Sequence, residues 1–237
     1  LYTSGSTGKP KGVVLENHSI VNFCHWYEKT FEMTSADRTL AYASFGFDAH
    51  MIDLYPALLC GAGAVILTSE GRLDVEDIVR TIRERHITVA FFTTQIAKLL
   101  FEPLEKTCIR VISYGGEQTP PVTIRSFEQY HVYGPTECTL FSSFHKITKE
   151  CDNPPIGASL PGYGLLVVDT KLHLVKQGMT GELVVAGEGL ARGYLDNPEL
   201  TAERFTNITI GGRTVKVYKT GDLCRWNADG QLEFMGR

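Results

Sequence analysis

Helix and strand patterns alternate between residues 74 and 116, and this alternation constrains the fold more than any other feature of the sequence. Residues 74–86 repeat apolar side chains at helical spacing, and the β-branched and aromatic run 88–92 follows at once. A second helical pattern over 95–101 leads to a strand pattern over 109–112, which ends on Gly115 and Gly116. Repeated pairs of this kind predict βα units on a mostly parallel sheet.

The pattern changes after about residue 154, where short apolar runs are separated by Gly, Asp and Asn turns. The chain is therefore predicted to have an α/β fold, with a parallel-sheet βα subdomain over 1–153 and a smaller, mainly antiparallel β subdomain over 154–237. The stretch Asp152–Pro155 marks the boundary. The sequence opens on Leu1 without an initiator Met or a signal pattern, so we expect an internal piece of a larger protein, truncated at both ends.

Composition excludes several classes of protein. Apolar residues make up 43% and charged residues 21% of the chain, which is typical of a folded domain rather than a disordered one. A net charge of -4 disfavours generic nucleic-acid binding. The six cysteines are scattered without CxxC or zinc spacing, which favours a reducing, cytoplasmic setting. The most apolar stretch, 54–67, is broken by Pro and Gly and is too short to cross a membrane.

The first candidate site is the loop over residues 3–12, which holds three glycines, four hydroxyl residues and two lysines. Such a loop can direct backbone N–H groups, hydroxyls and positive charge toward a polyphosphate. It is not a Walker loop, because Gly5 and Gly8 are too close and Pro10 stands where a Ser or Thr would open a helix. A flexible Gly/Ser turn is the weaker alternative.

Three further segments occur with this loop: YGPTE at 133–137, GELVVAGEGLARGYLDNPELTAERF at 181–205 and YKTGD at 218–222. Together with LYTSGSTGKPKGV they resemble signatures of the adenylate-forming superfamily, and specifically of nonribosomal peptide synthetase adenylation domains. The resemblance extends over the whole chain, to Gly236 and Arg237, which are similar to the opening of the next family motif. It implies the large domain of such an enzyme, without the small C-terminal subdomain that carries the adenylation lysine.

The residue types in YGPTE suit the purine of ATP, its α-phosphate and its bound metal ion. Tyr133 offers a flat face for the purine, Thr136 a hydroxyl for the α-phosphate, and Glu137 a hard oxygen ligand for Mg²⁺. The alternative is a Gly-Pro turn with a solvated Glu. The two acceptor oxygens of Asp222 suit a pair of ribose hydroxyls, whereas on its own this residue would be an exposed turn aspartate.

The resemblance implies two sets of nucleotide-site residues. The catalytic set is Thr3, Ser4, Lys9, Lys11, Thr136 and Glu137, the last also holding the metal. The cofactor-binding set is Ser6, Thr7, Gly8, Gly115, Gly116, Glu117, Tyr133, Gly134, Asp222 and Arg237.

The motif Phe45–Ala49 resembles the family segment whose aspartate pairs with the α-ammonium of an amino acid. A carboxylate such as Asp48 in an apolar pocket needs a cation, or its pKa rises. Apolar residues at helical spacing follow Asp48, so a helix N-cap is the alternative, and the two roles are compatible. The side-chain pocket carried over by position is apolar apart from one phenol hydroxyl and consists of Ala49, Ile52, Phe91, Ile112, Tyr114, Val132, Leu140 and Phe141.

The resemblance therefore implies ATP-dependent activation of an apolar amino acid as aminoacyl-AMP, with release of pyrophosphate. The acyl group would then pass to a phosphopantetheine thiol on a peptidyl carrier domain, beside condensation domains of a parent synthetase. The alternatives are an acyl-CoA synthetase-like ligase and a non-catalytic nucleotide-binding remnant. We expect this piece alone to be weakly active or inactive. His131 stands where the family usually has Asn, and we interpret it as structural.

Overall fold

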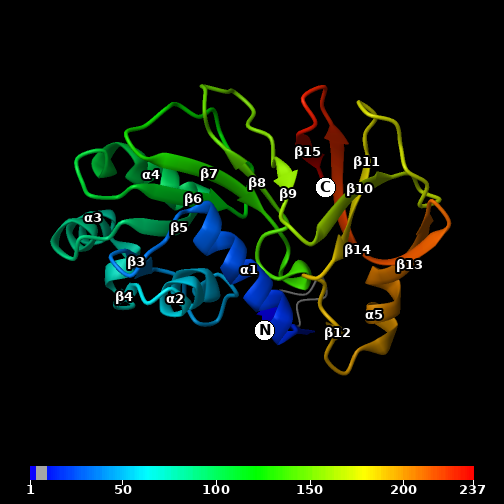
Figure 1. Cartoon of the computed structure of the whole chain (residues 1–237), viewed down its shortest axis with the longest axis horizontal. Helices are drawn as coiled ribbons and strands as arrows, with labels where there is room; N and C mark the ends of the chain where they lie inside the picture. The colour runs from blue at the N-terminus through cyan, green and yellow to red at the C-terminus, as the bar shows by residue number, and fades with distance from the viewer. Residues whose placement is uncertain (4–9) are drawn as a thin grey trace. The chain divides into compact units, whose positions relative to one another are not determined.

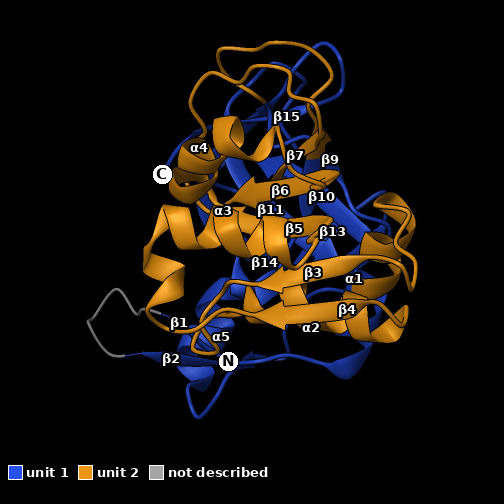
Figure 2. Cartoon of the chain, turned by 90° about the vertical axis from the view of Figure 1, so that its left-hand side faces the viewer, with its two compact units in different colours: residues 1–23, 133–144, 155–237 blue, residues 24–132, 145–154 orange. Residues whose placement is uncertain are grey.

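The computed structural model describes residues 1–3 and 10–237, which divide into two compact units. One unit contains residues 24–132 and 145–154, and the other contains 1–23, 133–144 and 155–237 (Figure 2). The sequence predicted two consecutive parts instead. The difference arises because strands near the N-terminus pair with a strand near residue 193, and residues 133–144 bond to residues after 155.

The unit of residues 24–132 and 145–154 is built on parallel strands in the order β4-β3-β5-β6-β7 (Figure 1). The strands are β3 (Arg38–Ala41), β4 (Gly63–Ile66), β5 (Val89–Thr93), β6 (Val111–Gly115) and β7 (Glu128–Tyr133). Its helices are α2 (His50–Leu59), α3 (Val75–Glu84) and α4 (Thr94–Leu104), with a 3₁₀ turn η1 (Gly71–Leu73), and α1 (Asn17–Thr30) contributes its residues from 24 onward. The predicted βα alternation is confirmed.

The two faces of this sheet are covered by different helices. Leu40, Ala90 and Phe92 pack with the apolar stripes of α3 and α4 in one core cluster. On the other face, Thr39 donates to the backbone of α2, and Tyr130 contacts Phe31, which directly follows α1. Covering both faces buries a parallel sheet, which explains why its central strands β5 and β6 are mostly apolar.

Helix α3 shows how local sequence sets an element. The Asp74 carboxylate accepts a 2.9 Å hydrogen bond from the backbone N–H of Glu76, which caps the helix start. Acidic Glu76 and Asp77 lie in the first turn and Arg83 in the last, as the helix dipole favours. Buried Ile78 and Ile82 give the helix its apolar stripe.

The other unit is mainly antiparallel, as predicted. Its larger sheet has the order β10-β11-β14-β13, with β15 paired to β14. These strands are β10 (Tyr163–Val168), β11 (Gly181–Gly187), β13 (Phe205–Ile210), β14 (Arg213–Trp226) and β15 (Leu232–Gly236). A small sheet joins β1 (Tyr2–Thr3), β2 (Lys11–Val14) and β12 (Gly193–Tyr194), and the remaining elements are η2 (Thr136–Cys138), β8 (Ser143–Lys146), β9 (Ala158–Ser159) and α5 (Pro198–Arg204).

Two expectations from composition can be compared with the structure. All six cysteines are free thiols, and three of them are buried. Among the described residues, no helix combines the length and the apolar character needed to span a bilayer.

Candidate active site

Three sequence motifs meet around the carboxylate of Glu137. The Tyr194 hydroxyl donates a 2.6 Å hydrogen bond to Glu137 Oε1, and Lys11 Nζ lies 4.0 Å from the same oxygen. Lys11 also sits 4.9 Å from the centre of the Tyr194 ring, a cation–π distance. Burial, and then the bond to Glu137, raise the pKa of Tyr194, so the phenol stays a donor at neutral pH. No local sequence pattern indicated a role for Tyr194, although it lies inside the GELVVAGEGLARGYLDNPELTAERF segment.

The loop that carries Glu137 is held in a strained shape. Thr139 and Leu140 adopt left-handed backbone angles, with φ of 56° and 69°, which non-glycine residues rarely do. The Thr139 hydroxyl donates to the carbonyl of Gly189 at 2.8 Å, and the Tyr163 hydroxyl donates to the carbonyl of Cys138 at 2.8 Å. These bonds stabilise a conformation that the loop would not adopt on its own.

Gly134, a predicted nucleotide-binding residue, has a packing reason to be glycine. A Cβ at this position would lie 2.1 Å from the carbonyl oxygen of Leu140. The absence of a side chain therefore lets the loop fold back on itself between Tyr133 and Thr136.

The second contact between distant motifs joins Tyr133, Asp222 and Arg237. The Tyr133 hydroxyl donates to Asp222 Oδ2 at 2.6 Å, and Arg237 Nε donates to Asp222 Oδ1 at 2.9 Å. Burial, and then the Asp222 charge, raise the pKa of Tyr133 well above its usual value. The Asp222 side chain is 8% exposed and that of Arg237 76% exposed, so a ligand that needs Oδ1 can displace the arginine into water.

Two contacts position Asp222 that the sequence analysis did not identify. Glu182 Oε1 accepts a 3.0 Å hydrogen bond from the backbone N–H of Gly221, and the Thr220 hydroxyl accepts one of 3.0 Å from the N–H of Asp222. Thr220 in turn donates to the carbonyl of Leu183 at 2.7 Å. The turn before Asp222 is therefore tied to strand β11, a long-range relation with no local sequence signal.

The remaining predicted residues of the first loop are only partly described. Thr3 lies in β1, and its hydroxyl is buried without a hydrogen-bond partner among residues 1–3 and 10–237. Ser4, Ser6, Thr7, Gly8 and Lys9 lie outside the described residues.

Strand β6 ends at Gly115, and Gly116 and Glu117 follow it, in the unit that contains the parallel sheet. A Cβ on Gly115 would lie 2.1 Å from the carbonyl oxygen of Val132, so this glycine is needed for the approach of β6 to β7. Gly116 has a left-handed φ of 91° and open space around its Cα, which leaves its backbone accessible.

Asp48 stands directly before helix α2. Helix α2 begins at His50, and Ala49 before it already has helical backbone angles and makes no side-chain capping bond, so Asp48 lies at the entry to the helix. A second carboxylate supports the loop before it: buried Asp53 Oδ2 accepts a 2.8 Å hydrogen bond from the N–H of Ala43. Burial raises the pKa of Asp53 well above its usual value. Ala49 is half-buried and Ile52 is buried in α2.

Strand register separates the predicted side-chain pocket. Phe91 pairs with Ser113, and Gly115 pairs with Val132, so Phe91, Ser113 and Val132 lie on one face of the sheet. Ile112 and Tyr114 lie on the opposite face, in the core cluster of α3 and α4. The eight positions therefore do not form one wall. Ser113 was not among the residues predicted from the sequence, and the strand alternation of VISYG is the signal that identifies it.

Leu140 and Phe141 belong to the unit that contains the Glu137 loop. Both side chains are buried, and the Phe141 ring contacts Phe23 edge-on, with centroids 5.3 Å apart. Thr136 opens the 3₁₀ turn η2 directly before Glu137.

The donor set around Glu137 fits a metal only when a phosphate ligand is present. Within the described ranges, no group of three or more His, Cys, Asp or Glu side chains could hold an ion. One carboxylate oxygen, Glu137 Oε2, makes no hydrogen bond to the described residues, while Oε1 is bonded to Tyr194. Mg²⁺ commonly takes one or two carboxylates and completes its shell with substrate phosphates and water, so this single carboxylate fits a magnesium–nucleotide complex.

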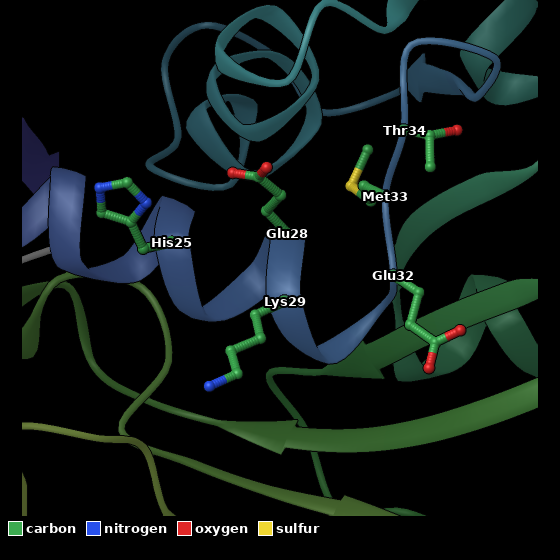
Figure 3. A pocket seen from close by; sticks show the side chains of 6 residues that line it. All are labelled: His25, Glu28, Lys29, Glu32, Met33 and Thr34. Carbon is green, nitrogen blue, oxygen red and sulfur yellow. The ribbon is translucent and has the colours of Figure 1, made fainter.

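A hollow of about 540 Å³ lies beside the end of α1. Figure 3 shows Glu28 and Lys29 pointing to different sides of the helix, and Glu32 pointing away from both. Because the polar groups do not converge, the hollow lacks the arrangement that a ligand site requires.

Comparison with known proteins gives consistent matches along the chain. The sequence profile of the family described as AMP-binding enzyme matches residues 1–195. Bacitracin synthase 1 of Bacillus licheniformis is 40% identical over 238 residues, covering 100% of this chain and 4% of that protein. The chain thus spans a small fraction of the length of this curated relative.

Two solved structures are similar over the whole chain. The Klebsiella oxytoca NpsA N-terminal subdomain in complex with 3-hydroxybenzoyl-AMSN has a TM-score of 0.86 and 29% identity, and this chain covers 63% of it. NpsA-ThdA, an artificially fused adenylation–PCP di-domain nonribosomal peptide synthetase from the same organism, has a TM-score of 0.87 and 28% identity, with 50% of it covered.

Proposed function

The chain belongs to the AMP-binding enzyme family, and on that premise we propose that it activates an apolar amino acid as aminoacyl-AMP, using ATP and releasing pyrophosphate. The observation that carries this proposal is the meeting of four distant motifs in one unit, through Lys11, Glu137 and Tyr194 and through Tyr133 and Asp222. Together they supply a cation, a metal-binding oxygen, an aromatic face and a diol-binding carboxylate.

The nucleotide is held by groups whose chemistry matches its parts. The Tyr133 ring stacks on adenine, and the Asp222 carboxylate accepts from the ribose hydroxyls, with Arg237 moving aside or contacting the sugar and phosphate. We assign Gly115, Gly116 and Glu117 to the nucleotide from the family resemblance, and the open backbone at Gly116 supports this assignment.

The reaction joins a substrate carboxylate oxygen to the α-phosphorus of ATP and breaks the bond from that phosphorus to the bridging oxygen, so that pyrophosphate leaves with its electrons. No general base is needed, because the carboxylate is already ionised at neutral pH. Lys11, with the hydroxyls and Lys9 of the first loop, offsets the charge of the leaving group, and Thr136 contacts the α-phosphate.

Magnesium is the cation for which Glu137 is suited, and it would supply charge neutralisation for the phosphates. The chain's own contribution is to position the Glu137 carboxylate. Tyr194 donates a hydrogen bond to it, Lys11 lies 4.0 Å from the same oxygen, and the strained turn at Thr139 holds its backbone.

The substrate class follows from Asp48 and the sheet face that carries Phe91. We assign Asp48 to the α-ammonium of an amino acid, which supplies the cation that a carboxylate in an apolar pocket needs. Phe91, Ser113 and Val132 offer two apolar walls and one hydroxyl, without a second charge. A neutral, mostly apolar amino acid matches this lining.

A second candidate is the activation of an aryl or fatty acid without an amine. It is favoured by one observation, the similarity to a subdomain whose structure contains 3-hydroxybenzoyl-AMSN. An acid without an ammonium group would leave Asp48 without its substrate partner, so the role of Asp48 separates the two candidates.

The fate of the adenylate is proposed from the relatives. The chain is similar to an adenylation–PCP fusion and to a bacitracin synthase. We therefore infer transfer of the acyl group to the phosphopantetheine thiol of a carrier domain, within a cytoplasmic synthetase that also contains condensation domains.

The test is ATP–pyrophosphate exchange in the intact parent protein, with a panel of amino acids against aryl and fatty acids. The proposal expects exchange with branched or other apolar amino acids, and its loss in Asp48→Ala while ATP affinity is kept. Asp152→Ala, at an exposed position, is the matched control. Exchange that depends on aryl or fatty acids and survives Asp48→Ala would establish the second candidate instead.

A further inference from the structure

A cavity of about 340 Å³ lies between helix α4 and the segment 119–125, in the unit with the parallel sheet. Tyr114 lines it from strand β6, on the face opposite Phe91, Ser113 and Val132. The cavity therefore lies on the other side of the sheet from the proposed amino-acid side-chain pocket.

The hydroxyl of Tyr114 is the first unexplained group in this cavity. The residue is 1% exposed, and its hydroxyl has no hydrogen-bond partner among the described residues. The ring is held by Phe101, edge-on with centroids 5.1 Å apart, and by His131, stacked at 5.8 Å. Burial raises the pKa of Tyr114, so the hydroxyl is a fixed, neutral donor. A buried donor without a partner costs free energy unless a ligand or water satisfies it.

The second unexplained group is Arg125. Its guanidinium forms an ion pair with Glu105, with NH1 2.9 Å from Oε1, but its buried Nε has no hydrogen-bond partner in the described chain. Lys98 adds a further cation from α4 and makes no ion pair with the described residues. No acidic side chain lines the cavity, and Lys98 is its one cation without an acidic partner among the described residues.

Two other hydroxyls in the cavity are hydrogen-bonded. The Thr119 hydroxyl bonds to His131 Nε2 at 2.9 Å, and the Thr94 hydroxyl donates to the carbonyl of Glu117 at 3.4 Å. Two unpartnered donors and one unpaired cation thus share a space whose remaining walls, including Phe101 and Val122, are apolar.

We propose that this cavity binds a small organic monocarboxylate with an apolar body. The carboxylate accepts from the Tyr114 hydroxyl and faces the positive charge of Lys98, while the apolar body contacts Phe101 and Val122. The volume is near the small end of the range of about 300–1,000 Å³ that ligand pockets occupy. The apolar walls favour an organic acid over inorganic phosphate.

The proposal is tested by ¹⁹F NMR with 4-fluorobenzoate as the probe and the protein in its longest folded form. We expect saturable binding that benzoate and cyclohexanecarboxylate displace, whereas neutral benzamide and inorganic phosphate do not. Tyr114→Phe and Lys98→Gln should each weaken binding about five- to tenfold, the usual effect of losing one hydrogen bond or charge contact. Tyr114→Phe removes only an unpartnered oxygen, so its thermal melting should stay close to that of the wild type.

Two control variants separate this cavity from other sites. Lys106→Gln, at an exposed position outside the cavity, should leave the affinity unchanged. Asp48→Ala should also leave it unchanged, whereas a carboxylate bound in the amino-acid pocket would bind differently once that negative charge is removed. Absence of binding, equal displacement by phosphate, or binding that is insensitive to both Tyr114→Phe and Lys98→Gln would overturn the proposal.

Discussion

The Tyr133 hydroxyl donates a 2.6 Å hydrogen bond to Oδ2 of Asp222, although 89 residues separate the two in the sequence. The bond ties the loop that begins YGPTE to the turn that ends YKTGD. This bond uses only the hydroxyl, so the face of the Tyr133 ring remains available for stacking. It also orients the Asp222 carboxylate, whose other oxygen accepts a hydrogen bond from Arg237. One contact therefore links the proposed base and ribose sites.

Tyr133→Phe keeps the aromatic ring and removes this bond. We expect ATP binding to weaken about tenfold, because a lost hydrogen bond to a charged group costs about 1.5 kcal/mol. Isothermal titration calorimetry measures the change, with Tyr55→Phe as the control. Unchanged ATP affinity in Tyr133→Phe would mean that Asp222 is oriented without the tyrosine.

Tyr194→Phe removes the donor to Glu137 while Lys11 stays nearby. We expect the Mg²⁺ concentration for half-maximal pyrophosphate exchange to rise about five- to tenfold, because the carboxylate loses the bond that aims it. Glu137→Gln should abolish the Mg²⁺ dependence together with exchange. A lower maximal rate at an unchanged Mg²⁺ requirement would contradict the positioning role of Tyr194.

Ser113 and Ile112 are neighbours on opposite faces of β6, and they should respond differently to substitution. Ser113→Val should change the ratio of kcat/KM between two amino acids by about tenfold, as expected for methyl groups added to a pocket. Ile112→Val should instead lower the free energy of unfolding by about 1 kcal/mol and leave the ratio unchanged. An exchange panel and urea denaturation measure the two effects. A preference altered by Ile112→Val alone would reverse the assigned faces.

Asp37→Asn tests an ion pair at the start of the parallel sheet. The Arg110 Nε and the Thr88 hydroxyl donate to Asp37 Oδ1 at 2.8 and 2.7 Å. Burial by itself would raise the pKa of Asp37, but these bonds and the Thr34 N–H outweigh it and lower the pKa to about 2. Because this pKa is below its unfolded value, the stabilisation is present above about pH 4 and is lost as the pH falls toward 2.

The expected cost of Asp37→Asn is therefore about 2 kcal/mol of unfolding free energy at pH 7, shrinking to about half of that by pH 3. Urea denaturation at pH 7, 5 and 3 measures the difference from the wild type. A difference that stays constant over this range would show that the carboxylate charge contributes nothing.

Much of the fold could be predicted because it depends on local pattern. The apolar spacing before and after residue 88 identifies a helix and a buried strand, and the structure has α3 and β5 there. The capping of α3 by Asp74 is likewise a local relation between a side chain and the next turn. The division into consecutive parts differed from the structure because β2 pairs with β12, and no local pattern encodes a partner 180 residues away.

The residues of the candidate site likewise fall into those that local sequence could identify and those that it could not. The motif residues Lys11, Glu137 and Asp222 could be chosen from the sequence, since their chemistry depends on residue type within a loop. Tyr194 and Glu182 could not be given roles, because each acts through a hydrogen bond to a distant segment. The prediction of the side-chain pocket was the part most sensitive to an error in position. Side chains alternate between the two faces of a strand, so an offset of one residue selects Ile112 or Tyr114 in place of Ser113 and assigns the pocket to the other face of the sheet.

The sequence alone determined the α/β and antiparallel halves, the loops and the residue types that suit a nucleotide, because helical period, strand alternation and turn chemistry act over a few residues. Only the tertiary structure decided that Tyr133 meets Asp222, that Tyr194 holds Glu137, and that Tyr114 faces a separate cavity. Those outcomes depend on strand register and on contacts between remote segments, which are set by packing of the whole unit rather than by any single stretch of the chain.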